Sequence, residues 1–237
     1  MTVAKSTILR RIKPMKENKL LRGLCVLTAA LMLGLTGCAN GSDTNGSDAQ
    51  SQADTAEVQS AWTELDQTTI TKEMGMGWNL GNQLEASNAG IPSETTWGNP
   101  TISEDLIKAV KEQGFKTVRI PVSYLDKIGA APDYTIDSAW LDRVQEVVDY
   151  VVGNDLYAII NIHGDGYYTV DKSWLRCVDD NQDEIKDKYE KVWAQIADRF
   201  KDYDQHLIFE SMNEESDNTY GKPNATGYEN INAYNQI

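Results

Sequence analysis

Hydrophobic and polar positions alternate from residue 61 to the end of the chain in a repeated strand-then-helix pattern. Four short apolar runs, each followed by polar residues, are expected to form strands: residues 74–80, 116–122, 156–162 and 207–212. Between these runs, apolar residues recur every three or four positions, as expected for helices that bury one face. Strands that alternate with helices predict an α/β fold, in which helices cover a parallel sheet.

The helical segments carry recognisable start and stop signals. Thr101 and Glu104 are spaced as a capping box, and Gly114 stands where that first helix is expected to end. A final amphipathic segment covers residues 228–237. The apolar faces of the two central helices are formed by Leu141, Val144, Val148 and Val151, and by Ile185, Tyr189, Val192, Ile196 and Phe200.

Two architectures fit four βα units. A closed (β/α)8 (TIM) barrel is built from units of this kind, and an open doubly wound sheet is the alternative. The glycines Gly75, Gly77 and Gly81 do not favour a nucleotide-binding sheet, because the third glycine comes one position too late for the dinucleotide fingerprint. Four strands cannot close a barrel, so we expect residues 61–237 to form only about the first four βα units of one.

The N-terminal residues have the pattern of an export signal. Residues 1–38 combine basic residues with the apolar run 24–35, which is too short to span a bilayer. The run ends in Leu-Thr-Gly-Cys, which resembles the bacterial lipobox and predicts lipidation of Cys38; a plain signal peptide is the alternative. The polar residues 39–60 are expected to form a flexible linker. We therefore expect an exported protein, lipid-anchored at a bacterial cell surface or extracellular, which meets the membrane only through its anchor.

Charge and residue counts exclude several classes of partner. The chain has 22 basic and 36 acidic residues and a net charge of −14. Because the basic residues concentrate in the signal, the remaining chain is more acidic still, which argues against a nucleic-acid partner. Only two histidines are present, so we expect no transition-metal site, and no cofactor is predicted.

The candidate chemistry lies where the predicted strands end, because a βα barrel builds its active site at that edge. These strand ends offer Asn79 and Asn82, Arg119, His163 with Asp165, and Asn213 with Glu214. By strand parity, Ile208, Glu210, Met212 and Glu214 are expected to share one face. A carboxyl group at such a tip can act as a general acid. The alternative is that Asn213 and Glu214 are two solvated residues that open a loop.

Four ordered motifs resemble glycoside hydrolase family 5, in particular its bacterial cellulase-like endoglucanases. They are Gly-Trp-Asn-Leu-Gly-Asn (77–82), Gly-Phe-Lys-Thr-Val-Arg-Ile-Pro-Val (114–122), Asn-Ile-His (161–163) and Phe-Glu-Ser-Met-Asn-Glu (209–214). The resemblance runs from about residue 73 to residue 237. It implies a (β/α)8 barrel and retaining endo-hydrolysis of a β-1,4-glucan.

The resemblance also implies roles for individual residues. Glu214 matches the general acid/base, and Asn213 the residue that binds the sugar 2-hydroxyl. Arg119 matches the arginine that supports the nucleophile, and His163 lines the −1 sugar site. The family often has a second histidine after the first, where this chain has Gly164.

Further sugar contacts are expected from residues in the strand-to-helix loops. Candidates for stacking are Trp97, Trp174 and Tyr167, and Asn82 is a candidate for hydrogen bonding. These contacts leave cellulose, xyloglucan, mannan and mixed-linkage glucan open as substrates.

Retaining hydrolysis needs a second carboxylate roughly 5–5.5 Å from the first. Glu215 is expected to point to the opposite face, and Glu210 is expected to pair with Arg119, because an unpaired buried carboxylate is costly. The nucleophile is therefore expected to lie beyond residue 237, which would make the 237-residue chain an inactive fragment. The alternative function is a lipid-anchored, non-catalytic carbohydrate-binding protein.

Overall fold

The computed structural model describes residues 66–217 and 225–237. The chain divides into two units, Met1–Ala56 and Glu57–Ile237, and all described residues belong to the second. The predicted signal, the linker and Cys38 lie outside the described residues. Within the described ranges, none of the helices has both the length and the apolar character needed to cross a bilayer.

Four strands form one parallel sheet: β1 (Gly77–Asn79), β4 (Thr117–Ile120), β5 (Tyr157–Asn161) and β6 (Leu207–Glu210). Their order in the sheet, β1-β4-β5-β6, follows their order in the sequence. The parallel α/β prediction is confirmed. A doubly wound sheet reverses its strand order at a switch point, and the described sheet shows no reversal.

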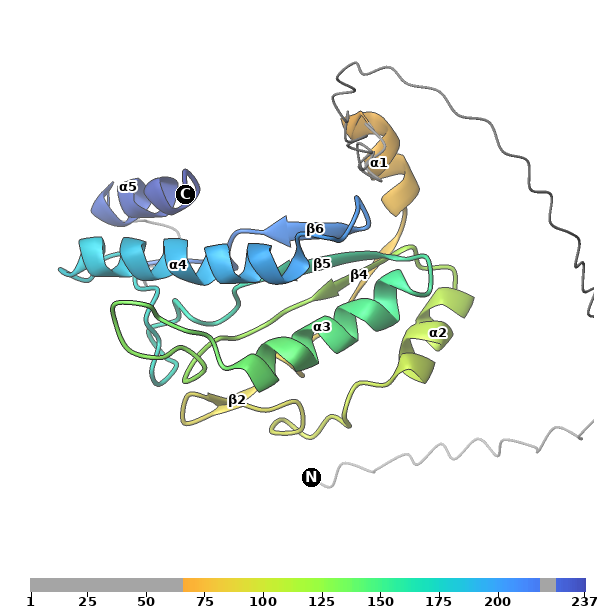
Figure 1. Ribbon diagram of the computed structural model, residues 1–237, viewed down its shortest axis with the longest axis horizontal. Helices are drawn as coiled ribbons and strands as arrows, with labels where there is room; N and C mark the ends of the chain where they lie inside the picture. Colours follow the sequence, from red (N-terminus) through yellow and green to blue (C-terminus); the bar gives the residue numbers. More distant parts are fainter. Residues whose placement is uncertain (1–65, 218–224) are drawn as a thin grey trace, which may run out of the picture. The chain divides into compact units, whose positions relative to one another are not determined.

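Four helices cover the sheet: α2 (Glu104–Glu112), α3 (Ser138–Val152), α4 (Gln182–Phe200) and α5 (Ala225–Tyr234). Each helix packs against the next one in the sequence, α2 on α3, α3 on α4 and α4 on α5 (Figure 1). The apolar stripes predicted for α3 and α4 are buried in the same core as the strand residues that face them.

The strands alternate between a helix-covered face and a polar face. In β4, Val118 and Ile120 are fully buried in the helix-covered core, whereas Arg119 between them is only half-buried. In β5, Ala158 and Ile160 join that core. Because side chains alternate along a strand, Arg119 projects to the opposite face, where the polar residues gather.

The start of the domain differs from the prediction. Helix α1 (Gln67–Met74) was not expected, and it ends where the first strand was predicted to begin. Its N-cap is Asp66, whose carboxylate accepts a hydrogen bond from the Thr69 N–H at 2.9 Å. Strand β1 is therefore only three residues long. Helix α1 has no apolar stripe to predict it, because it is started locally by the Asp66 N-cap in a sequence of mixed polarity.

Two smaller features also depart from expectation. The N-cap of α2 is Ser103, not Thr101, and its hydroxyl accepts from the Leu106 N–H at 3.3 Å. The antiparallel hairpin of β2 (Ser87–Asn88) and β3 (Ile91–Pro92) was not predicted. The helix stop at Gly114 is confirmed, since this residue has φ +93°, the left-handed conformation that glycine adopts readily.

Candidate active site

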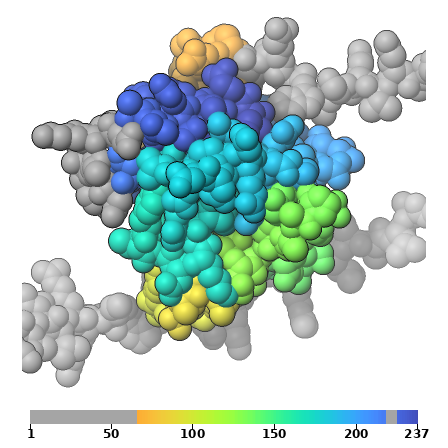
Figure 2. Space-filling model, turned by 90° about the vertical axis from the view of Figure 1, so that its left-hand side faces the viewer, coloured from red at the N-terminus to blue at the C-terminus, as the bar shows by residue number. Residues whose placement is uncertain are grey.

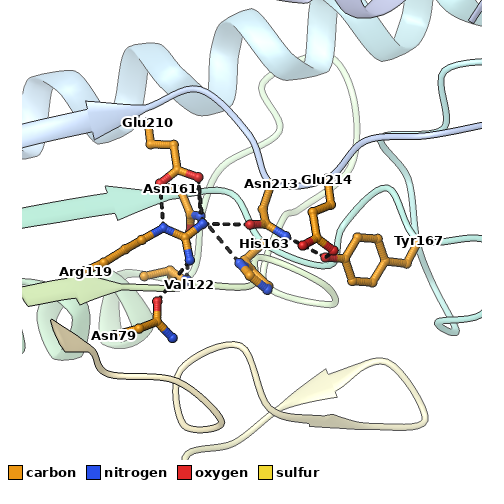
Figure 3. A network of polar contacts seen from close by, with 9 residues as sticks. All are labelled: Asn79, Arg119, Val122, Asn161, His163, Tyr167, Glu210, Asn213 and Glu214. Carbon is orange, nitrogen blue, oxygen red and sulfur yellow. Dashed lines mark hydrogen bonds and ion pairs between the residues drawn. The ribbon is translucent and has the colours of Figure 1, made fainter. Parts of the chain in front are cut away.

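An ion pair between β4 and β6 forms the base of the polar face. Arg119 donates from Nε to Glu210 Oε2 and from Nη2 to Glu210 Oε1, both at 2.6 Å, so the predicted pair is confirmed (Figure 3). The side chains are 26% and 32% exposed, so the pair is half-buried. Burial opposes ionisation of Glu210, but the hydrogen bonds from Arg119 and Asn161 outweigh it and lower the pKa of Glu210. The arginine also donates to Asn79 Oδ1 at 3.0 Å.

The chain leaves the sheet immediately after β6, and this turn places Asn213 and Glu214. The Asn213 N–H donates to the Ile162 carbonyl at 3.0 Å, and the Asn213 side chain is buried. Glu214 has φ +50° and is exposed. Strand parity therefore does not extend to residue 214. Glu210 and Glu214 reach the same polar network because the backbone turns, and not because the strand continues.

Asn213 connects the ion pair to the exposed carboxylate. Its Oδ1 accepts from Arg119 Nη2 at 2.6 Å, and its Nδ2 donates to the Tyr167 hydroxyl at 2.6 Å. The Tyr167 hydroxyl in turn donates to Glu214 Oε2 at 3.2 Å. The described residues thus bring Arg119, Asn213 and Glu214, three of the four predicted catalytic residues, into one network.

The fourth, His163, joins this network through β5. Asn161 Nδ2 lies 3.4 Å from His163 Nδ1 and donates to Glu210 Oε1 at 3.2 Å. The imidazole also meets the Tyr167 ring edge-on, with centroids 6.2 Å apart. Burial lowers the pKa of His163, and the nearby Arg119 charge acts in the same direction. A neutral imidazole at this position can accept or donate a hydrogen bond to an uncharged ligand.

The loop after β5 is held down by Asp165, which is fully buried. The carboxylate accepts from the Tyr124 N–H at 3.1 Å and from Trp174 Nε1 at 2.7 Å. Burial raises the pKa of Asp165 to about 7. Figure 2 shows that the loop after β5 (cyan) lies on the surface between the segment after β1 (yellow) and α5 (blue). Asp165 therefore fixes the loop that presents Tyr167.

Glu215 packs beneath the same loop. A methyl group at Gly166 would overlap the Glu215 carboxylate, since the Cβ position lies 1.4 Å from Oε2. Both carboxylate oxygens are buried without a hydrogen-bond partner among the described residues. Burial, with a smaller contribution from the Asp165 charge, raises the pKa of Glu215 to about 9. The Glu215 carboxylate is therefore buried beneath the loop, whereas Glu214 is exposed.

Of the predicted sugar contacts, Tyr167 lies in the Arg119 network, and Trp97, Asn82 and Trp174 lie outside it. Trp97 is 53% exposed, and its Nε1 donates to the Ser87 carbonyl at 2.9 Å. Asn82 is also exposed, and its carbonyl accepts from Asn99 Nδ2 at 2.8 Å. Trp174 is half-buried, and besides its bond to Asp165 its ring is covered by the Lys188 ammonium, 4.5 Å from the centroid. These contacts give Trp174 a structural role, while sugar stacking stays a prediction for both tryptophans.

Glu85 was missed by the sequence reasoning. Its carboxylate is buried and accepts from the backbone N–H groups of Asn82 and Gln83. Its charge favours the protonated forms of Arg119 and His163: it contributes to the raised pKa of Arg119 and opposes the burial that lowers the pKa of His163. Nothing in the sequence marks this glutamate, because it follows the strand end by six residues and sits in an irregular loop.

The site therefore contains one exposed carboxylate, Glu214, beside a carboxylate that an arginine neutralises. Only Glu214 is open to a ligand, because Arg119 and Asn161 occupy the oxygens of Glu210. The buried amide of Asn213 is oriented from both ends, which suits it to a fixed hydrogen-bonding role.

Comparisons with known proteins agree with this geometry. The sequence profile of the family described as "Cellulase (glycosyl hydrolase family 5)" matches residues 79–237. Endoglucanase A of Paenibacillus barcinonensis is 60% identical over 168 residues, which is 71% of this chain and 42% of the relative. The cellulase/esterase CelE of Acetivibrio thermocellus is 51% identical over 145 residues, 61% of this chain and 16% of the relative.

Solved structures show the same relationship. A family 5 xyloglucanase from Paenibacillus pabuli has a TM-score of 0.70 and 61% identity, covering 70% of this chain and 46% of that one. A broad-specificity endoglucanase from Ruminococcus champanellensis with bound cellotriose has a TM-score of 0.68 and 41% identity, covering 74% and 52%. These neighbours imply a (β/α)8 barrel, whereas the number of units in this protein stays a prediction. The chain belongs to glycoside hydrolase family 5.

Proposed function

We propose that this protein is a retaining endo-β-1,4-glucanase in which Glu214 is the general acid/base. The observation that carries the proposal is the position of Glu214, which is exposed at the carboxyl edge of the sheet. Tyr167 donates a hydrogen bond to its carboxylate, and Arg119 donates one to the neighbouring Asn213. In the first step Glu214 protonates the leaving glycosidic oxygen, and in the second it deprotonates the attacking water. Asn213 binds the sugar hydroxyl next to the reacting carbon.

The nucleophile of the proposed mechanism is a carboxylate outside these 237 residues. Glu210 is held by Arg119 and Asn161, and Glu215 is buried against Gly166, so neither is free to attack a sugar. The chain spans 42% of the length of Endoglucanase A and 46% of the solved xyloglucanase. We therefore assign the second carboxylate to the part of the barrel that these relatives have beyond the matched segment.

The proposed substrate is a neutral β-1,4-linked glucan, either plain or branched. The solved relatives include a chain described as a family 5 xyloglucanase and a broad-specificity endoglucanase with bound cellotriose. The exposed indole of Trp97, at the hairpin beside the site, offers an apolar face on which a glucose ring can stack.

The experiment uses the full-length protein and cellotetraose. Proton NMR of the first products should show the β-anomer before mutarotation, because two displacements restore the configuration. An initial α-anomer would contradict the retaining mechanism. Calorimetric binding of cellotetraose without any hydrolysis would instead support the alternative, a non-catalytic carbohydrate-binding protein.

We further propose that the protein is exported and lipid-anchored through Cys38. The support is the short apolar run that ends in Leu35-Thr36-Gly37-Cys38. In a bacterial host, a radioactive fatty acid should label the wild-type protein and not the Cys38→Ser variant, which should appear in the medium or remain as an unprocessed precursor. Equal labelling of both proteins would refute the anchor at this residue.

A further inference from the structure

The hydrogen bonds around Asn213 run in one direction, and this direction can be deduced from the donors. A guanidinium group has only donors, so the atom of Asn213 that faces Arg119 Nη2 at 2.6 Å is the amide oxygen. The amide nitrogen therefore faces Tyr167, and it can only donate to the Tyr167 oxygen at 2.6 Å.

The hydroxyl of Tyr167 is oriented as a consequence. A phenol has one donor and two acceptor sites, and Asn213 occupies an acceptor site. The phenolic proton is then free for the neighbouring carboxylate, Glu214 Oε2, which lies 3.2 Å away and is a pure acceptor when ionised. Burial and the Glu214 charge raise the pKa of Tyr167 to about 12, so the proton stays on the phenol at neutral pH.

We propose that Tyr167 is a positioning residue for the acid/base, and that its hydroxyl holds the Glu214 carboxylate by a donated hydrogen bond that Arg119 and Asn213 orient. This inference rests on the proposed role of Glu214. Arg119, Asn213 and Tyr167 thus form a relay of donors that starts at the Glu210 ion pair and ends on Glu214 (Figure 3).

The relay has a specific consequence for catalysis. A hydrogen bond donated to a carboxylate favours its ionised form, which makes the group a better proton donor to the leaving oxygen. It also fixes one carboxylate oxygen and leaves the other, Oε1, for the glycosidic oxygen. Glu214 is exposed, and among the described side chains only that of Tyr167 is hydrogen-bonded to its carboxylate.

Tyr168 provides a matched control in the same loop. Its hydroxyl accepts from the Val178 N–H at 3.1 Å, and the Arg176 guanidinium lies over its ring, 5.2 Å from the centroid. Tyr168→Phe therefore removes a hydroxyl group and its hydrogen bond from the same loop, whereas Tyr167→Phe removes the hydroxyl group that bonds both Asn213 and the Glu214 carboxylate.

The first test needs no catalysis. In ¹⁵N-labelled full-length protein, the side-chain amide resonances of Asn213 should move with pH as Glu214 ionises, because Tyr167 connects the two groups. The movement should vanish in Glu214→Gln and in Tyr167→Phe, and persist in Tyr168→Phe. Movement that persists in Tyr167→Phe would overturn the relay, whether or not the protein hydrolyses glucan.

The second test measures the pH profile of kcat/KM. In Tyr167→Phe the alkaline limb should shift upward by about half to one pH unit, the equivalent of one lost hydrogen bond, and Tyr168→Phe should show no shift. Hydrolysis of an unactivated glucan should fall about 3- to 10-fold, and that of a dinitrophenyl glycoside less than about 2-fold.

An unmoved alkaline limb, with equal losses on both substrates, would leave Tyr167 as a merely structural or sugar-binding residue. That result would overturn this inference while Glu214 remained the acid/base, whereas an inactive wild-type protein would refute the proposed function itself.

Discussion

The variant Glu210→Gln tests whether the Glu210 carboxylate supports the site or reacts with the substrate. In the wild-type protein Glu210 accepts two hydrogen bonds from Arg119 at 2.6 Å and a third from Asn161 at 3.2 Å. The glutamine keeps the shape of the side chain but has only one acceptor oxygen. Its NH2 group would face an N–H of the guanidinium, so one strong hydrogen bond is replaced by a contact between two donors.

The expected loss of stability follows from the exposure of the pair. Removing one partner of a fully buried ion pair costs about 3–5 kcal/mol, and exposed pairs contribute about 1 kcal/mol or less. The side chains of Arg119 and Glu210 are 26% and 32% exposed, so we expect a loss of about 2 kcal/mol at pH 7. The assay is urea unfolding of the full-length protein, with Glu190→Gln, an exposed glutamate on α4, as the control.

The effect should also depend on pH. The pKa of Glu210 is lowered in the folded protein, so the contribution of the pair is present above the usual value of 4.5 and is lost as the pH falls through the folded value. The difference between wild type and Glu210→Gln should therefore be largest near pH 7 and shrink towards pH 3. Activity should fall, but not vanish, because in the proposed mechanism Glu210 orients Arg119 and is not a reacting group. Unchanged stability with complete loss of turnover would refute this reasoning, since it would make Glu210 a reacting group.

Variants of two further residues, Glu215 and Trp97, test the surroundings of the site. Glu215→Gln should stabilise the protein at pH 8 by about 1–3 kcal/mol, because the folded-state pKa of about 9 lies above the unfolded value and stability falls as the pH rises between them. The gain should be absent at pH 4 and absent in Glu190→Gln; a destabilised Glu215→Gln variant would contradict the unpartnered burial of the carboxyl group. Trp97→Ala should raise KM for cello-oligosaccharides about 10-fold with little change in kcat, and Trp97→Phe should retain most of the binding. A change in kcat alone would argue against stacking.

The repeated pattern of the sequence predicted most of the fold. Buried runs such as Val118 to Ile120 and the helical stripe of Val144, Val148 and Val151 lie in the expected elements. The elements that were missed depend on local chemistry. Helix α1 is started by Asp66 in a segment without buried residues, and the two-residue strands of the hairpin are too short to show a period.

The site could be predicted as a set of residues but not as an arrangement. Strand ends identified Arg119 and Asn213, since the carboxyl ends of parallel strands meet at one edge. Parity could not place Glu214, because its left-handed backbone, φ +50°, redirects the side chain after the strand has ended. The contacts of Tyr167 and Glu85 come from irregular loops, where spacing along the sequence carries no information about direction.

The most direct test of Glu214 as the acid/base is the kcat/KM of full-length Glu214→Ala on two substrates that differ in their leaving groups. On cellotetraose, whose leaving oxygen must be protonated, kcat/KM should fall about 10²- to 10⁴-fold. On a dinitrophenyl β-cellobioside, whose leaving group departs without protonation, kcat/KM should change by less than about 10-fold. Equal losses on the two substrates would contradict the assignment of Glu214.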